Sequence, residues 1–436
     1  MKNPLRSVAL LCLLLVASCG SQPSRLAKSP VQPLLILVSV DGMHPDYLQR
    51  GLTPTLQDLA DRGVRAESMR PSFPTLTFPN HYTLVTGLRP DRNGIVNNTM
   101  EDARIPDQRF SLSNREAVMD ARWWDQAVPL WTSLRRSGQQ AATMFWPGSE
   151  APIHGHHPDY WHPFDAKMST DARVDSVLGW LDLPAAKRPR LMTLYFEGVD
   201  SAGHRYGPDS EQVNTELKVV DAAIARLLEG LDKRSLRESV NLVIVSDHGM
   251  AATSPERVVY MDDLLPADAA RVVVYGVLTA IEPKAGHSQQ IEAILLTEHD
   301  NMRCWRKSEV PARLHYGSNP RIPSLLCLAN DGWTISSHDY VDKAVANSRF
   351  SLGQHGYDNE DPSMRALFIA YGPSFRRGLV VPEFDNVDVY PLLARLLAIP
   401  EEANDGDYRN VSGFLNTSLP SPAKSPTSAK ESAVTR

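Results

Sequence analysis

Short apolar runs that alternate with helical patterns constrain the fold of this chain most strongly. Residues 34–40 (LLILVSV) have the length and the branched side chains of a strand that is buried on both faces. Similar runs stand at residues 141–145, 191–196, 242–246 and 366–371. Helical patterns lie between them, at residues 53–62, 128–136, 210–231 and 387–397. This alternation predicts an α/β fold with a mostly parallel central sheet and helices on both of its faces.

The chain of 436 residues, 42% of them apolar, is long enough to bury the core of one large domain. We expect that domain to span residues 34–405. Glycine, proline and polar residues break the pattern at about residues 265–353, which predicts a smaller inserted or peripheral subdomain there. From residue 416 to 436 the chain is rich in Ser, Pro, Thr, Lys and Ala, a composition that predicts a disordered tail.

The N-terminus has the features of an export signal. Lys2 and Arg6 precede an apolar run at residues 8–16, which is too short to span a hydrocarbon core of about 30 Å. The sequence Val-Ala-Ser-Cys resembles a bacterial lipobox, in which Cys19 becomes the lipid-modified first residue; an ordinary signal peptide is the alternative. We therefore predict a signal peptide at residues 1–18, a polar tether at residues 19–33, and a periplasmic or outer-membrane lipoprotein anchored through Cys19.

The use of cysteine agrees with export. Of the four cysteines, Cys12 leaves with the signal and Cys19 carries the lipid, so that Cys304 and Cys327 remain. A pair in an oxidising compartment favours a disulfide, with two buried free thiols as the alternative.

The charge of the chain excludes one class of function. A net charge of −6 and an isoelectric point near 6.1 argue against an electrostatic nucleic-acid-binding surface. A small phosphate-containing substrate remains compatible, because bound metal ions supply local positive charge.

Acidic and histidine side chains gather next to the predicted strands. Asp41 directly follows residues 34–40, Asp200 and His204 follow residues 191–196, and Asp247 and His248 end the run at residues 242–246. His355 lies shortly before the run at residues 366–371. In an open parallel sheet the carboxyl ends of the strands face one crevice where ligands bind. The pattern therefore predicts that the Asp and His side chains after the first three of these strands meet there, with His355 as a further candidate.

A single aspartate after a strand is usually a turn former or a helix cap. Three aspartates and three histidines together exceed what one zinc ion uses, since zinc in proteins is commonly four-coordinate. Six ligands suit two zinc ions, and ions about 3.5–4 Å apart favour in-line displacement at phosphorus.

Thr77 is the candidate nucleophile. The segment at residues 71–87 is rich in proline at first and becomes helix-like from Pro79, so that Thr77 lies just ahead of a helix start. Backbone N–H groups and the helix dipole favour an anion there. A threonine hydroxyl needs a metal or a base to become a nucleophile, and a helix N-cap is the alternative role for Thr77.

Several sequence blocks occur here in a fixed order: VDG, PTLTFPNHY, VTGL, EGVDSAGH, SDHGM and HGYDN. From about residue 35 to 397 the chain resembles the nucleotide pyrophosphatase/phosphodiesterase family of the alkaline-phosphatase superfamily. The resemblance implies an alkaline-phosphatase-like fold and cleavage of nucleoside 5'-phosphodiester or pyrophosphate bonds, which releases nucleoside 5'-monophosphates through a phosphothreonine intermediate.

The resemblance also implies a role for each matching residue. Asp41, Asp247 and His248 match the ligands of the zinc ion that holds and activates Thr77. Asp200, His204 and His355 match those of a second zinc ion, which meets the leaving group and later the attacking water.

Asn98 matches a side chain that donates to a non-bridging phosphate oxygen, with the neighbouring Asn97 as its rival. Phe78, Tyr160 and Tyr195 match residues that line the substrate pocket, although Tyr160 is equally compatible with a core position. The histidines at 154, 156, 157 and 162 are left out of the metal set.

Two other readings remain at this stage. The chain is alternatively a relative that acts on another ester, as a phosphonate hydrolase, a phosphomonoesterase or a choline-phosphodiester lipase. A zinc-holding surface lipoprotein without catalytic activity is the reading from a different class. The natural substrate and the oligomeric state stay open.

Overall fold

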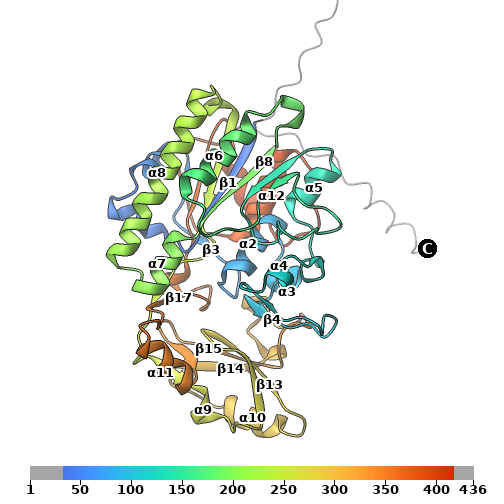
Figure 1. Cartoon of the computed structure of the whole chain (residues 1–436), viewed down its shortest axis with the longest axis vertical. Coiled ribbons are helices and arrows are strands. Elements are labelled where there is room, and N and C mark those ends of the chain that lie inside the picture. The colour runs from blue at the N-terminus through green and yellow to red at the C-terminus, as the bar shows by residue number, and fades with distance from the viewer. Residues whose placement is uncertain (1–32, 417–436) are drawn as a thin grey trace, which may run out of the picture. The chain divides into compact units, whose positions relative to one another are not determined.

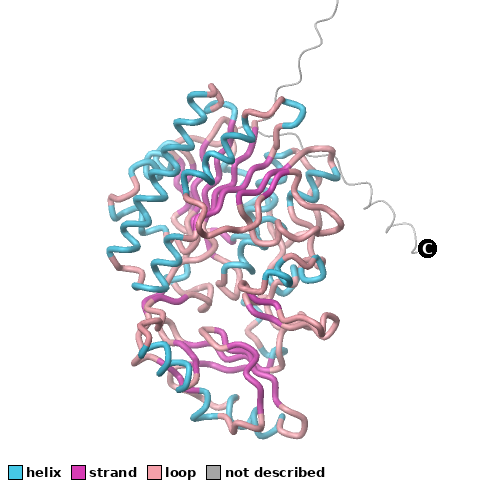
Figure 2. Tube along the Cα trace, viewed as in Figure 1, coloured by secondary structure: helices cyan, strands magenta, loops and turns pink. Residues whose placement is uncertain are grey.

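An eight-stranded sheet is the centre of the structure, a computed structural model that describes residues 33–416 (Figure 1, Figure 2). Its middle strand β1 (Leu34–Val40) lies between β8 (Leu191–Phe196) and β9 (Val240–Val245), and it is parallel to both. The predicted signal peptide, Cys19, the tether up to residue 32 and the tail from residue 417 lie outside the described residues.

The strand order in this sheet is β19-β2-β18-β9-β1-β8-β6-β7. The outer strands are β19 (Leu379–Val381), β2 (Val64–Ala66), β18 (Phe368–Tyr371), β6 (Ala141–Met144) and β7 (Tyr160–Trp161). Only β18 runs against its neighbours β9 and β2; the other pairs are parallel. The prediction of a mostly parallel sheet is confirmed. The start of β18 consequently lies at the same edge as the carboxyl ends of β9 and β1.

Successive side chains of β1 point to opposite faces of the sheet, and each face is covered by helices (Figure 1). Ile36 and Val38 belong to a buried cluster with helices α1 (Pro54–Arg62), α6 (Thr170–Leu181), α7 (Gly198–Tyr206) and α8 (Glu211–Lys233). Leu35 and Leu37 belong to a second cluster with α2 (Thr77–Thr86), α5 (Leu130–Arg136) and α12 (Val389–Leu397). The predicted two-sided helical cover is confirmed.

The remaining elements are short. The helices are α3 (Pro90–Asn93), α4 (Arg115–Val118), α9 (Met261–Leu264), α10 (Ser288–Leu295), α11 (His338–Ala346) and α13 (Tyr408–Val411). The strands of four small two-stranded sheets are β3 (Met69–Arg70), β4 (Thr99–Met100), β5 (Phe110–Ser111), β10 (Ala251–Ala252), β11 (Val258–Tyr260), β16 (Thr334–Ser336), β17 (Gly353–Gln354) and β20 (Phe384–Asp385). Between residues 33 and 416 no helix has both the length and the apolar character that crossing a membrane requires.

A four-stranded antiparallel sheet lies within residues 265–353. Its order is β12 (Ala270–Val274), β13 (Leu278–Pro283), β15 (Leu325–Ala329) and β14 (Met302–Arg306). Its apolar side chains belong to the same buried cluster as one face of the main sheet, and contacts do not separate it from the rest of the described residues. The subdomain boundaries therefore stay predictions.

Arg321 joins this region to residues 94–102 through hydrogen bonds and an ion pair. Its side chain is fully buried and donates to Asp102 over 2.7 Å and to the carbonyl of Gly94 over 2.7 Å. Burying an arginine is costly unless a carboxylate and other acceptors surround it. The contact between this region and the rest of the chain therefore depends on these partners of Arg321.

A disulfide joins β14 and β15. Cys304 and Cys327 lie directly opposite each other in the two strands and are bonded. The predicted pairing is confirmed.

Replacing both cysteines by alanine should lower the free energy of unfolding by about 3 kcal/mol, because the bond closes a loop with a sequence separation of 23 residues. Urea and thermal unfolding measure the change. A reducing agent should destabilise the unmodified chain and leave the double variant unaffected. Equal stability of the two proteins without reductant would contradict the prediction.

Candidate active site

The carboxyl ends of β1 and β9 carry three buried polar side chains. Asp41 follows β1, and Asp247 and His248 follow the end of β9 by two and three residues; all three are almost completely inaccessible to solvent. His248 Nε2 is 3.0 Å from Asp247 Oδ2 and 3.5 Å from Asp41 Oδ1. The strand ends therefore bring together the three residues that the sequence assigns to one ion.

The second predicted set comes from α7 and from the segment before β18. Asp200 and His204 lie one turn apart on α7, with His204 Nε2 at 3.5 Å from Asp200 Oδ1. His355 Nε2 is 3.1 Å from His204 Nε2 and 3.6 Å from Asp200 Oδ1. These three side chains also meet as predicted.

A short antiparallel pairing joins the two sets. Strand β10 follows His248 and pairs with β17, which directly precedes His355. The two imidazole rings consequently stack, with centroids 3.5 Å apart and planes at 12°. Ligand atoms of Asp200, His248 and His355 lie within 4.8 Å of one another, so that the two sets form one continuous centre.

The three imidazoles are oriented in the same way. Each Nδ1 lies within hydrogen-bond distance of a backbone carbonyl: Gly353 for His204 at 2.8 Å, Gly249 for His248 at 2.9 Å and Thr75 for His355 at 2.9 Å. A proton on Nδ1 leaves Nε2 as the free lone pair that faces the carboxylates. Metal-binding histidines are commonly held by such a second hydrogen bond.

Buried carboxylate oxygens supply a second test of whether metal ions fit. Asp41 Oδ1, Asp200 Oδ1 and Asp247 Oδ2 are buried without a hydrogen-bond partner among the described residues. An unpaired buried charge is costly unless it is paired or binds a metal. Three such oxygens beside three free imidazole nitrogens are the donor set that Zn²⁺ takes in proteins.

The pKa shifts express the same crowding of negative charge. Burial, together with the charges of Asp247 and Asp200, raises the pKa of Asp41 well above its usual range. Burial alone would raise the pKa of Asp247, but the neighbouring His248 and His81 hold it well below its usual value. Positive charge added beside Asp41 would lower its pKa and favour the ionised form.

His81 is a buried residue of the site that the sequence analysis missed. Its Nδ1 is 2.9 Å from the carbonyl oxygen of Thr77 and 3.3 Å from Asp247 Oδ2, and its Nε2 is 2.8 Å from Ser39 Oγ. Although its ring lies close to Asp41 and Asp247, both nitrogens are engaged. His81 thus links the backbone of Thr77 to the metal site. The helical spacing of four residues from Thr77 was the available signal.

Thr77 lies at the first position of α2, not ahead of it as the sequence analysis placed it. The helix begins two residues before Pro79, because a proline in the first turn gives up an N–H that has no helical partner in any case. Leu76 is the N-cap and makes no side-chain capping bond. The hydroxyl of Thr77 therefore does not cap its own helix, and it lies 3.3 Å from His248 Nε2.

Asn98, not Asn97, contacts the nucleophile helix. The backbone N–H of Phe78 donates to Asn98 Oδ1 over 3.0 Å, whereas Asn97 Oδ1 accepts from the nearby N–H of Thr99. Because Asn98 Oδ1 accepts from the Phe78 N–H, the amide N–H groups of Asn98 remain as donors to an acceptor beside Thr77.

The aromatic residues divide into those near the site and one that is not. Tyr195 donates its hydroxyl to Asp41 over 2.5 Å, and Phe78 is half-buried against Trp124. Tyr160 lies on the edge strand β7, where its hydroxyl donates to the carbonyl of Lys187. The structure therefore does not bring Tyr160 to the others.

Phe164, which the sequence analysis did not single out, is 40% exposed with its ring 6.2 Å from that of Tyr195. It provides the exposed aromatic surface next to the site that was expected from Tyr160. A lone phenylalanine in a polar loop gave no sign of this position.

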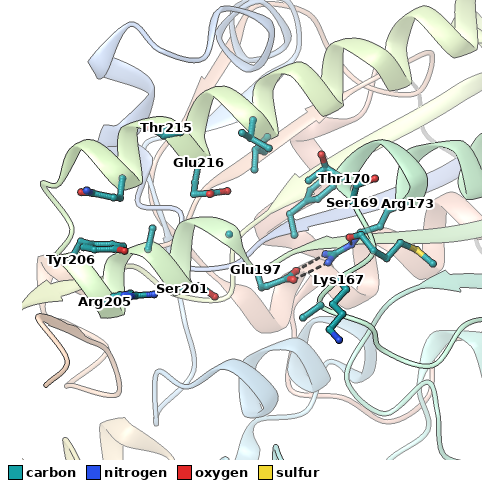
Figure 3. A pocket seen from close by; sticks show the side chains of 18 residues that line it. Lys167, Ser169, Thr170, Arg173, Glu197, Ser201, Arg205, Tyr206, Thr215 and Glu216 are labelled. Carbon is teal, nitrogen blue, oxygen red and sulfur yellow. Dashed lines mark hydrogen bonds and ion pairs between the residues drawn. The ribbon is translucent and has the colours of Figure 1, made fainter. Parts of the chain in front are cut away.

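A cavity of about 790 Å³ lies between α6, α7 and α8, and its lining includes the partly buried ion pair of Arg173 and Glu197 (Figure 3). Its lining includes Ser201 and Arg205 of α7, but none of the predicted metal ligands. The site is therefore defined by the converging side chains and not by this cavity.

Comparison with known proteins agrees with this architecture. Residues 35–358 match the family model described as type I phosphodiesterase/nucleotide pyrophosphatase. A pyrophosphatase/phosphodiesterase of Schizosaccharomyces pombe, itself uncharacterised, is 37% identical over 86% of this chain and 79% of its own length. Human ectonucleotide pyrophosphatase/phosphodiesterase family member 5 is 35% identical over 90% of this chain and 80% of its length.

Solved structures are similar as well. Human family member 5 superposes with a TM-score of 0.83 at 35% identity, over 88% of this chain and all of that one. The murine protein, solved as an inactive threonine-to-alanine variant in complex with AMP, also gives 0.83 at 33% identity and the same coverage. A venom phosphodiesterase of Naja atra is 37% identical, but this chain spans only 49% of its length.

The fold and the site thus define a hydrolase of the alkaline-phosphatase superfamily. Within it, this chain belongs to the type I phosphodiesterase/nucleotide pyrophosphatase family, whose members are metal-dependent hydrolases.

Asn98→Ala should lower kcat on a nitrophenyl nucleoside monophosphate by about 10²–10³-fold, the usual cost of removing one donor to a developing negative charge. Asn97→Ala is the matched control and should stay close to the unchanged enzyme. Steady-state release of nitrophenol measures both. A larger loss with Asn97→Ala would reverse the assignment.

Proposed function

We propose that this protein is a two-zinc phosphodiesterase/nucleotide pyrophosphatase with Thr77 as its nucleophile, cleaving nucleoside 5'-phosphodiester or pyrophosphate bonds. The observation that carries the proposal is the position of the Thr77 hydroxyl, 3.3 Å from His248 Nε2 at the edge of a centre of three carboxylates and three imidazoles. The alternative role as a helix cap is not seen, since Leu76 is the N-cap and Thr77 is the first helical residue.

The division of the ligands between the two ions follows the family resemblance, and contacts of 3.0–3.6 Å within each set are compatible with it, although ligand atoms of Asp200, His248 and His355 also lie within 4.8 Å of one another. Asp41, Asp247 and His248 would hold the ion beside Thr77, and Asp200, His204 and His355 would hold the other. When bound, zinc ions lower the pKa of a hydroxyl group or a water molecule and neutralise charge that develops on phosphate oxygens.

The chain's own residues then perform two displacements. Thr77 Oγ loses its proton and attacks phosphorus, the bond to the leaving oxygen breaks, and that oxygen takes up a proton as a phosphothreonine forms. Water then attacks the same phosphorus from the opposite side; its oxygen becomes part of the nucleoside 5'-monophosphate, and one of its protons returns to Thr77 Oγ. Two inversions predict retained configuration at phosphorus. The amide of Asn98 donates to a non-bridging oxygen in both steps, since Phe78 N–H already occupies its oxygen.

The family match favours a diester over a monoester, since its model is described as type I phosphodiesterase. The AMP complex of the murine relative supports a nucleoside substituent, for which Phe78, Phe164 and Tyr195 offer apolar surface.

The cellular setting is a further part of the proposal. The relatives include ectoenzymes and venom enzymes, which agrees with an exported protein. Export and anchoring through Cys19 rest on the N-terminal sequence alone.

Thr77→Ala should lower turnover of nitrophenyl thymidine monophosphate by at least about 10³-fold, because the variant lacks the hydroxyl that forms the covalent intermediate. The matched assay uses nitrophenyl phosphate, a monoester, which should be a poor substrate. Preference for the monoester would move the protein to the phosphatases. Turnover that survives in the variant would exclude Thr77 as the nucleophile.

Complete removal of metal by a chelator should abolish diester hydrolysis, and added Zn²⁺ should restore it up to two equivalents per chain. Metal analysis and activity are measured on the same samples. The Thr77→Ala variant is the control, since it keeps all six Asp and His ligands and should still bind both ions. Activity that persists after verified metal removal would overturn the mechanism.

A further inference from the structure

Thr75 connects the nucleophile segment to the segment that carries His355. It lies two residues before Thr77, and its side chain is completely buried. His355 Nδ1 lies 2.9 Å from the carbonyl oxygen of Thr75, in the bond that orients this imidazole. One residue of the nucleophile loop thus orients a ligand of the second predicted ion.

The hydroxyl of Thr75 makes two more bonds to the same segment. Gly356 N–H donates to Thr75 Oγ1 over 2.9 Å, and Thr75 Oγ1 donates to the carbonyl of Tyr357 over 3.0 Å. Without this hydroxyl, a buried N–H group and a buried carbonyl would lose their partner, which costs more than the bonds themselves are worth. The hydroxyl therefore holds the backbone that directly follows His355.

Asn80 holds the nucleophile segment from its other side. Its amide nitrogen donates to the carbonyls of Pro74 and Leu76, at 2.9 and 3.0 Å, and these two residues flank Thr75. Its oxygen accepts the N–H of Ser72 over 2.8 Å. These bonds hold the backbone on both sides of Thr75, which is the point of attachment for the other segment.

Gly356 shows how closely the two segments approach. Its φ of +108° is rarely adopted by residues with a side chain, and a Cβ there would lie 3.0 Å from Leu76 Cδ2. The two segments are therefore closely packed at this point, and the bonds of Thr75 contribute to holding them together.

We infer that Thr75 is a positioning residue, which sets the His355 imidazole relative to Thr77 and thereby raises the affinity of the Asp200, His204 and His355 site for its zinc ion. The inference rests on the proposed two-zinc function, because it assigns a task at one of those two sites.

Thr75→Val tests it, since valine keeps the shape and removes only the hydroxyl. Loss of the group that directly holds a metal-binding histidine typically changes metal affinity by about 10–100-fold. Thr75→Val keeps the carbonyl that faces His355 Nδ1 and removes only the hydroxyl that holds Gly356 and Tyr357, so we expect a rise near the lower end, about tenfold, in the dissociation constant of one of the two zinc ions, measured on the full chain by competition with a chromophoric chelator. At saturating zinc, kcat on the diester should also fall. Thr75→Ser, which keeps the hydroxyl, should restore most of the zinc affinity.

Thr193→Val is the matched control. Thr193 is equally buried, and its hydroxyl donates over 3.0 Å to the carbonyl of Phe145, away from the metal ligands. It should lose stability on thermal unfolding without losing zinc affinity. Unchanged zinc binding in Thr75→Val, or an equal loss in Thr193→Val, would overturn the inference. If Thr75→Val does not fold, Thr75→Ala takes its place under the same criterion.

The zinc titration contains no substrate, so the two proposals fail separately. A chain that binds two zinc ions but does not hydrolyse the diester would contradict the proposed function and leave the Thr75 comparison valid. A chain that binds no zinc would contradict both.

Discussion

Three carboxylates that meet beside the carboxyl ends of β1 and β9, two of them almost completely buried, are the constraint on which the rest of the site depends. Asp41, Asp200 and Asp247 each have an oxygen without a hydrogen-bond partner among the described residues, and two of them raise the pKa of the third. Burial of like charges is unfavourable unless cations are bound. Metal binding should therefore contribute directly to the stability of this site, as it does wherever the bound ion compensates charges that folding has buried.

The direction of one strand explains why a late segment of the chain can reach this centre. In an all-parallel sheet, the residues before β18 would enter at the edge opposite to the carboxyl ends of the other strands. Because β18 is antiparallel to β9, its start lies beside Val245, and the preceding segment carries His355 to His248. The apolar run at residues 366–371 predicts a strand, but nothing in the run itself indicates its direction. From the sequence, the place of His355 therefore rested on the family resemblance.

Local sequence patterns predicted the positions of individual strands and helices. The apolar run of β1 and the helical pattern of α1 match the structure within one residue, because each pattern reports the burial of its own side chains. The hydrogen bonds that support the site are different in kind. Thr75 bonds to Tyr357, which is 282 residues away in the sequence. The acceptor is a backbone carbonyl, so the type of residue at position 357 gives no sign of the bond. The position of Tyr160 likewise depends on a non-local feature, because it lies on β7, and the sequence does not indicate which strand forms the edge of the sheet.

The position of Thr77 shows how a helix start can serve a reaction. At an N-cap, the hydroxyl of a threonine is used to satisfy a backbone N–H of its own helix. Thr77 is instead the first helical residue, after the N-cap Leu76, whose side chain makes no capping bond. Its hydroxyl is therefore available to face His248. The helix start then needs another acceptor for its N–H groups, and Asn98 provides one for Phe78. The same hydrogen bond holds Asn98 next to the nucleophile. The absence of a side-chain cap at Leu76 thus leaves the Phe78 N–H free to position the amide donor of Asn98.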